Sequence, residues 1–191
     1  DIMTNFENKF QPMAKDVVSQ NLDGLIVASP SNPTGTMLSK DELTDLIDAS
    51  HSIGANFISD EIYHGIQYEK KAVSALEVTD NCYVINSFSK FFSMTGWRVG
   101  WMVVPEKHIR MVERLAQNLF ICSPHISQVA ALEAMSCEDD LVHNLDIYRE
   151  NRQIIMDGLL QIGFENFAPP DGAFYFYVDI AKYSDDSLSF C

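Results

Sequence analysis

A single lysine, Lys90, lies in the serine- and phenylalanine-rich stretch NSFSKFFSMTGWRVGW, which runs from residue 86 to residue 101. Most lysines keep their amine in water while the stem lies on apolar side chains. Burial, however, lowers the pKa of an ammonium group, and a neutral amine is a nucleophile that forms Schiff bases. Arg98 and the neighbouring serines could bind a phosphate. The stretch therefore fits either a surface lysine or a nucleophile beside an anion site.

Polar side chains follow three predicted strands at the point where each strand ends. The apolar runs LDGLIVAS, ANFISDE and CYVINS are typical of buried strands, and Asn32, Asp60 and Ser87 lie at or just after their ends. Open α/β sheets bind ligands at the carboxyl ends of their strands, so we expect these side chains to lie near Lys90. Taken singly, the candidates also fit structural roles: a turn former (Asn32), a helix cap (Asp60), half-buried packing (Tyr63), a strand-end hydrogen bond (Ser87) and a surface ion pair (Arg98).

Together these groups match the needs of a cofactor that is a pyridine aldehyde. The aldehyde needs a lysine for its Schiff base, and the ring nitrogen needs an acid that keeps it protonated, which makes the ring an electron sink. The phenolic oxygen needs donors, and a phosphate needs hydroxyls and a guanidinium fork. The chain supplies the full set: Lys90, Asp60, Tyr63, Asn32, Ser87 and Arg98.

Helices between the apolar runs would position these residues. Ser39 and Glu42 have capping-box spacing, and Gly54 ends the apolar pattern that follows them, which predicts a helix between the first two strands. Further helices are predicted over residues 106–119, 123–135 and 139–161, with Ser123 and Pro124 as the N-cap and first-turn pair of the second. GAFYFYVDI is predicted to be a strand, and Trp97 and Trp101 are expected to pack in the core.

The connection between the third strand and the segment VGWMVV is about a dozen residues long, which is marginal for a helical crossover. We therefore expect the strand around Trp101 to run antiparallel to its predecessor. Strands that alternate with helices indicate a mostly parallel sheet covered by helices.

Three short motifs resemble those of a known family. SFSKFFSMTGWRVG is similar to the lysine motif of class I/II aminotransferases, of the aspartate aminotransferase type among fold-type I pyridoxal-phosphate enzymes. SNPTG and DEIY match that family's two other signatures in the same order, and the resemblance runs from about residue 22 to residue 177. It implies a cytoplasmic, homodimeric transferase that uses pyridoxal 5'-phosphate to move an amino group between an amino acid and a 2-oxo acid.

The resemblance also implies a role for each candidate residue. Lys90 would hold pyridoxal 5'-phosphate as a Schiff base and then act as general base and acid. Asp60 would pair with the ring nitrogen, and Tyr63 and Asn32 would bind the phenolate oxygen. The remaining implied roles are phosphate binding (Ser87 and Arg98) and orientation of the lysine segment (Ser89).

The expected fold class is α/β. It comprises a three-layer α/β/α large domain with a mostly parallel mixed sheet, in which one strand is antiparallel, and the start of a small α+β C-terminal domain. Residues 1–145 would belong to the large, cofactor-binding domain and residues 146–191 to the small one. The family's carboxylate-binding arginine lies beyond the strand that matches GAFYFYVDI, and no arginine follows that stretch here. We therefore expect a fragment that has little or no transaminase activity alone.

Two other functions share these motifs. Carbon–sulfur β-lyases keep the same lysine, aspartate, tyrosine and arginine set and eliminate instead of transferring an amino group. A pyridoxal-phosphate-dependent transcription regulator would carry the same fold as an effector domain beside a basic DNA-binding domain.

The overall charge excludes some classes of partner. The 191 residues carry a formal net charge of −14, which argues against binding to nucleic acid or to anionic membranes.

The four cysteines show neither a CxxC motif nor a metal-ligand spacing, so we expect free thiols and no metal site.

Overall fold

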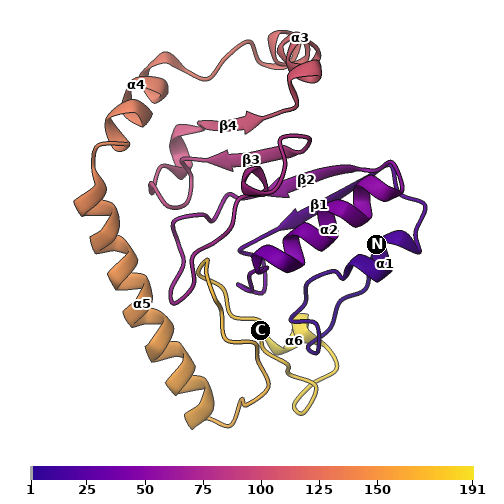
Figure 1. Ribbon diagram of the computed structural model, residues 1–191. Helices are drawn as coiled ribbons and strands as arrows, with labels where there is room; N and C mark the ends of the chain where they lie inside the picture. Colours follow the sequence, from indigo (N-terminus) through magenta and orange to yellow (C-terminus); the bar gives the residue numbers. More distant parts are fainter. Residues whose placement is uncertain (1) are drawn as a thin grey trace.

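Short apolar runs form the strands of one four-stranded sheet: β1 (Gly24–Ala28), β2 (Asn56–Asp60), β3 (Tyr83–Ser87) and β4 (Gly100–Val103). The structure, a computed structural model, describes residues 2–191 (Figure 1). The strands lie in sequence order, β1 to β3 are parallel, and β4 is antiparallel to β3. The predicted reversal of direction at β4 is thus confirmed. Its physical reason is that the connection from β3 is too short for a crossover helix.

The helix α2 (Lys40–Ser52) forms the crossover between β1 and β2, and it begins where the sequence predicts. Ser39 accepts a hydrogen bond from the Glu42 backbone amide, and the Glu42 carboxylate accepts one from the Ser39 amide, which completes a capping box. Gly54, with φ of +76°, follows the last turn. Leu43, Leu46 and Ile47 of α2 are buried against the sheet together with the short helix α1 (Ala14–Val18).

The two faces of the sheet differ in exposure. Leu25 and Val27 of β1 are buried in the core formed with α2, whereas Ile26 between them is 69% exposed. Trp97 and Trp101 were expected in the core, but they are 43% and 41% exposed, so that prediction is wrong for the described residues. Trp101 stands on β4, whose side chains are exposed along its length, and its ring contacts Phe88 instead.

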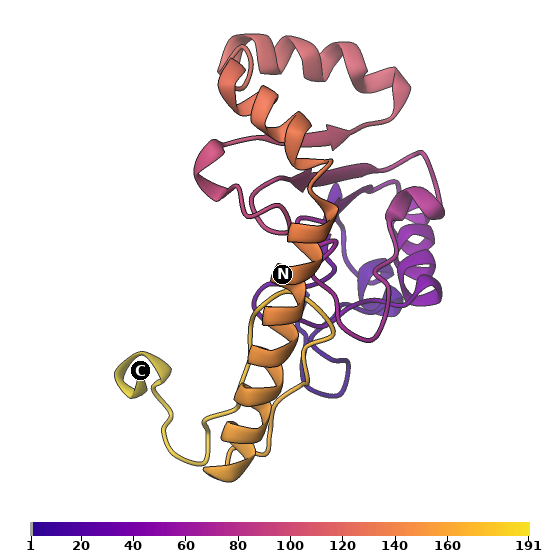
Figure 2. The same cartoon turned by 90° about the vertical axis from the view of Figure 1, so that its left-hand side faces the viewer.

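Helices α3 (Ile109–Leu119), α4 (His125–Ala134) and α5 (Glu138–Gln161) lead away from the β4 edge of the sheet (Figure 1). The turned view shows α5 as a long column that descends from α4 toward the C-terminal segment (Figure 2). The predicted cap of α4 is wrong. Pro124 occupies the N-cap with extended ψ of 137°, and Ser123 instead accepts a hydrogen bond from Gln128 through its carbonyl.

The stretch GAFYFYVDI is not a strand, contrary to the prediction. It forms two isolated bridges, Gln67 with Gly172 and Phe167 with Val178, because its backbone donors go to nearby loops and not to a neighbouring ladder. A short helix, α6 (Ser187–Phe190), ends the chain and is capped by Asp186.

Two further expectations concern the membrane and the cysteines. Among residues 2–191, no helix is both long enough and apolar enough to cross a bilayer. All four cysteines are free, and burial raises the pKa of the Cys82 thiol to about 11, which keeps it protonated and unreactive.

Candidate active site

The loop between β3 and β4 carries Lys90 and is held by its own backbone. The Phe88 amide donates to the Val99 carbonyl at 3.1 Å, and the Ser93 amide donates to the Lys90 carbonyl at 3.0 Å. Ser93 and Arg98 both adopt left-handed conformations, with φ of 55° and 56°. Such strained positions persist where surrounding contacts over-determine them and concentrate at functional sites.

The lysine loop is locked against the turn that follows β2. Gly65, with φ of +96°, lies so close to the ring of Phe91 that a side chain at Gly65 would overlap that ring. Phe91 directly follows Lys90 in the sequence. The close approach therefore fixes the lysine relative to the DEIY motif.

Two aromatic rings flank the half-buried Lys90 amine. Its Nζ lies 5.6 Å from the ring centre of Tyr63 and 5.9 Å from that of Phe174. An amine between aromatic faces has fewer water neighbours than an amine on an open surface, and a cation there is attracted by the rings. Lys90 is thus a loop lysine whose amine, and not only its stem, lies against aromatic rings. The contact with Phe174 was not anticipated from the sequence.

Tyr63 is buried at the centre of the candidate site. Its hydroxyl lies 2.5 Å from the hydroxyl of Tyr175. Burial, the hydrogen bond with Tyr175 and the nearby Asp60 carboxylate raise the pKa of the Tyr63 phenol, and a hydrogen bond from Asn32 opposes the shift. Tyr63 is therefore a protonated hydrogen-bonding group at neutral pH. Asn32, which follows β1, lies near Tyr63 as expected, although its own side chain is largely exposed.

Asp60 ends β2 between the ends of β1 and β3, where it pairs with Ala28 and Ile85. Its Oδ1 accepts a hydrogen bond from the Ile62 amide at 3.1 Å. The sequence suggested a helix cap as the structural role of Asp60, but within residues 2–191 no helix directly follows β2, and the carboxylate caps a turn. This cap does not conflict with a role at the site, because the same turn carries Tyr63.

Ser87, Ser89 and Arg98 line a common groove of about 420 Å³ beside the end of β3. The Ser87 hydroxyl accepts a hydrogen bond from the Ser89 amide at 3.0 Å, and Nη1 of the exposed Arg98 donates to the Thr95 carbonyl at 2.9 Å. Two hydroxyls and a guanidinium in one groove are a donor set suited to a phosphate.

A buried acid, Glu61, was not singled out from the sequence. It is 3% exposed, and its Oε1 accepts hydrogen bonds from Ser59 Oγ, Ser74 Oγ and the Ala75 amide at 3.0, 3.0 and 2.8 Å. Its Oε2 lies 3.4 Å from Nδ1 of His64. Glu61 therefore ties the DEIY turn to the chain that leads into β3.

His64 extends this tie to Ser29, which directly follows β1. Its Nε2 lies 3.0 Å from the Ser29 carbonyl, and because a carbonyl only accepts, Nε2 is the donor in this hydrogen bond. Glu61 and His64 thus brace the segment between Asp60 and Tyr63 from two sides. In the sequence Glu61 lies inside the DEIY motif and His64 directly follows it, and that position was the only signal for them.

We expect Glu61→Ala to lower the free energy of unfolding by about 3 kcal/mol or more, because it removes a buried carboxylate that accepts three hydrogen bonds. Glu61→Gln should cost less, since an amide oxygen can still accept those hydrogen bonds. Urea denaturation measures the difference. Glu113→Ala is the control: it breaks an exposed ion pair with Arg110 and should cost less than about 1 kcal/mol. Equal losses for Glu61→Ala and Glu113→Ala would contradict the bracing role.

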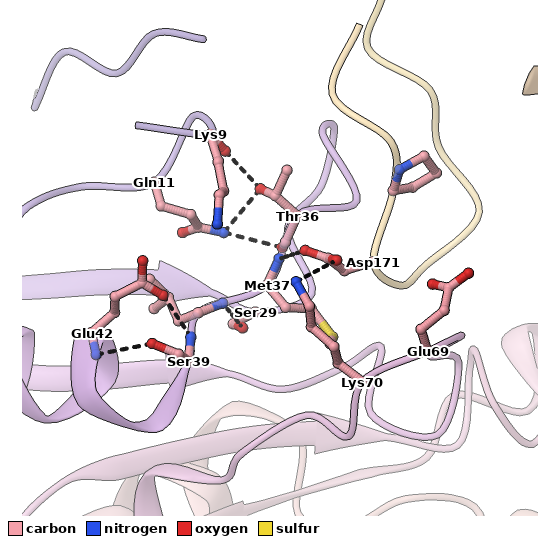
Figure 3. Close-up of polar contacts among 12 residues, drawn as sticks. Lys9, Gln11, Ser29, Thr36, Met37, Ser39, Glu42, Glu69, Lys70 and Asp171 are labelled. Atoms are coloured by element: carbon pink, nitrogen blue, oxygen red, sulfur yellow. Dashed lines mark hydrogen bonds and ion pairs between the residues drawn. The ribbon is translucent and has the colours of Figure 1, made fainter. Parts of the chain in front are cut away.

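The C-terminal segment is docked onto the loops after β1 and β2 through Asp171. Its Oδ2 accepts from the Met37 amide at 3.2 Å, and its Oδ1 pairs with Lys70 Nζ at 3.1 Å (Figure 3). The loop after β1 is also held from the N-terminal side, where Gln11 Nε2 donates to the Thr36 carbonyl at 3.1 Å and the Thr36 hydroxyl donates to the Lys9 carbonyl at 2.8 Å (Figure 3). Three distant parts of the chain therefore meet beside the SNPTG loop.

Comparisons with known proteins agree with the motifs. The family model "Aminotransferase class I and II" matches residues 2–189. The valine–pyruvate aminotransferase of Mycobacterium tuberculosis is 41% identical over 97% of this chain and 49% of its own length.

Two solved structures show the same fold. An aminotransferase structure from Silicibacter pomeroyi is 60% identical in sequence, with a TM-score of 0.97. The match covers 100% of this chain and 51% of the Silicibacter chain. The aspartate aminotransferase of Thermotoga maritima is 30% identical in sequence, with a TM-score of 0.91. The match covers 100% of this chain and 51% of the Thermotoga chain.

The chain thus spans about half the length of the curated relatives it matches. The predicted mixed sheet with one antiparallel strand is confirmed, and it is the sheet of these fold-type I neighbours. The chain belongs to the class I and II aminotransferase family.

Proposed function

We propose that the protein is an aminotransferase that moves an amino group between an amino acid and a 2-oxo acid, with pyridoxal 5'-phosphate bound at Lys90. The observation that carries the proposal is the convergence at one sheet edge of an amine, a buried phenol and a groove of phosphate-type donors. Named relatives are aminotransferases for valine and pyruvate or for aspartate, which supports the same reaction type here.

The residues present fit the cofactor that class I and II aminotransferases use, pyridoxal 5'-phosphate. Ser87 and Arg98 share a groove and would hold its phosphate. Tyr63 is protonated and would donate to its phenolic oxygen together with Asn32. Asp60 at the end of β2 would keep its ring nitrogen protonated. When bound, the cofactor supplies an electron sink for the carbon that exchanges the amino group.

The chain's own residues would do the rest of the chemistry. Lys90 would hold the cofactor through its amine, and as a free amine it would take a proton from the substrate α-carbon and later donate it again during the exchange of the amino group. The rings of Tyr63 and Phe174 would keep water away from that amine. Phe91 and Gly65 would fix the lysine loop against the turn that carries Asp60 and Tyr63.

Three finer statements are part of the proposal. The protein would act as a homodimer in the cytoplasm. Residues 1–145 would belong to the large domain and residues 146–191 to the small one, with the boundary inside α5. The docking of Asp171 onto the large-domain loops would then be a contact between the two domains.

The attachment site can be tested directly. The full-length product of the gene is incubated with pyridoxal 5'-phosphate, reduced with borohydride, digested and mapped. We expect the label on Lys90, which lies beside Tyr63, and not on Lys70, whose amine is engaged with Asp171 at the surface. Label on a different lysine would overturn the assignment. An assay that follows amino transfer alongside pyruvate and ammonia release separates transfer from β-elimination.

A further inference from the structure

Tyr175 brings a second phenol to the candidate site from the far end of the chain. Its hydroxyl lies 2.5 Å from the Tyr63 hydroxyl, and the two residues are 112 positions apart. The two rings also pack edge to face with centres 5.6 Å apart. A second edge-to-face contact joins Tyr63 to Phe174 at 5.5 Å. The hydroxyl contact therefore belongs to a packed cluster and not to a loose surface approach.

Several hydrogen bonds fix the backbone that precedes Tyr175. The amides of Asp171 and Gly172 both donate to the Gly35 carbonyl at 2.9 Å. The Ala173 amide donates to the Ile66 carbonyl at 2.9 Å, and the Tyr68 hydroxyl donates to the Ala173 carbonyl at 2.5 Å. The segment is thus attached to the loop after β1 and to the loop after β2.

The backbone of this turn is closely packed against the neighbouring loops. A side chain at Gly172 would overlap Pro30 and the Ile66 carbonyl. Ala173 is fully buried and adopts a left-handed conformation with φ of 56°. A non-glycine residue holds such a conformation only where neighbouring contacts enforce it. The turn therefore delivers Tyr175 to Tyr63 with little freedom.

We propose that Tyr175 is a positioning residue of the proposed site. Its hydroxyl donates a hydrogen bond to the Tyr63 oxygen, so that the Tyr63 hydroxyl donates its own hydrogen bond to the phenolic oxygen of the bound cofactor. The proposal rests on the proposed function. A phenol carries one proton, so in a pair of phenols only one can donate to the other. The hydrogen bond raises the pKa of Tyr63 only when Tyr63 is its donor, and in that direction Tyr63 could not donate to a ligand. The proposal therefore requires the direction to reverse when a ligand accepts the Tyr63 hydrogen. With Tyr175 as donor, the two hydrogen bonds run in one direction and strengthen each other.

The consequence concerns the charge on the cofactor oxygen. A donor that is itself hydrogen-bonded stabilises a neighbouring oxygen anion better than an isolated donor does. The deprotonated form of the bound cofactor, which carries more negative charge, is therefore favoured. The bound cofactor then loses its proton at a lower pH. The other polar groups that face Tyr63 are Asp60, Asn32 and Lys90, and they are the same in every variant described below.

The test follows the absorbance of pyridoxal 5'-phosphate bound to the full-length protein as the pH is varied. Tyr175→Phe removes one oxygen and keeps the ring contact with Tyr63. We expect it to raise the pH midpoint of the absorbance change by about 0.4–1 unit, the equivalent of one neutral hydrogen bond. Tyr177→Phe is the matched control. It removes a hydroxyl two residues along the same segment, where the ring packs on Phe10 and is largely exposed. Its midpoint should equal that of the parent.

A double-mutant cycle separates a role through Tyr63 from a general structural role. Tyr63→Phe should raise the midpoint by itself, and adding Tyr175→Phe should then produce no further shift. An additive shift in the double variant, or no shift in Tyr175→Phe while the cofactor stays attached to Lys90, overturns the inference and leaves the proposed function intact. A parent protein in which Lys90 takes up no cofactor overturns both.

Discussion

We expect Lys90→Ala to lower the rate of the proposed amino transfer by about 100-fold to 10,000-fold, which is the usual contribution of one positioned proton-transfer group. We expect this effect because Lys90 is the amine that lies between the rings of Tyr63 and Phe174. The loss should fall on the catalytic rate constant more than on the Michaelis constant, because the groove that contains Ser87 and Arg98 is untouched. Steady-state kinetics of the full-length protein measure both constants.

Two further variants separate proton transfer from charge. Lys90→Arg keeps a positive charge, but a guanidinium does not lose its proton at working pH, so its loss should be as large as that of Lys90→Ala. Lys40→Ala removes an exposed lysine at the start of α2 and should leave the rate unchanged. A Lys90→Arg variant that works at the parental rate would show that only a charge is needed there.

Asp60→Asn should lower the catalytic rate constant by about 100-fold or more, the size of effect seen when one preorganised electrostatic group is removed. An amide carries no charge with which to keep the cofactor's ring nitrogen protonated. Its oxygen can still accept from the Ile62 amide, so the turn that carries Tyr63 should stay in place. Cofactor affinity should therefore fall by much less than the rate. Equilibrium binding of pyridoxal 5'-phosphate and single-turnover kinetics provide the two numbers.

The control for this variant is Asp45→Asn, which neutralises an exposed acid on α2. It should change neither the affinity for the cofactor nor the catalytic rate constant. If Asp60→Asn turned over at the parental rate, Asp60 would act only as the cap that its contact with Ile62 reveals. A loss of cofactor affinity as large as the loss of rate would indicate that the whole turn had moved.

The sheet and its first crossover could be predicted because local rules determine them. The capping box of Ser39 and Glu42 lies within four residues, and the direction of β4 follows from the length of one connection. The convergence of Asn32 and Asp60 near Tyr63 was predictable for a similar reason, since parallel strands end at the same edge of a sheet.

Other features depend on contacts that the local sequence does not encode. Tyr175 and Phe174 lie beside Tyr63 and Lys90 only because the turn around Gly172 docks onto the loop after β1, more than 100 residues earlier. The same docking takes backbone donors away from a ladder, so the pattern GAFYFYVDI mispredicts a strand. The burial of Glu61 was not predictable either. Acids are rarely buried without hydrogen-bond partners, and the partners of Glu61 come from two separate segments of the chain.

The distance along the chain between Tyr63 and Tyr175 has a consequence for how the protein is made. Contacts between residues that are far apart in sequence form slowly, because a long loop must close before they contribute. A ribosome completes β1 to β4, with Lys90 among them, well before it adds the turn at Gly172. We expect the sheet to form first and the aromatic surroundings of the lysine to be completed last, so that a nascent chain acquires its stable core before its finished active site.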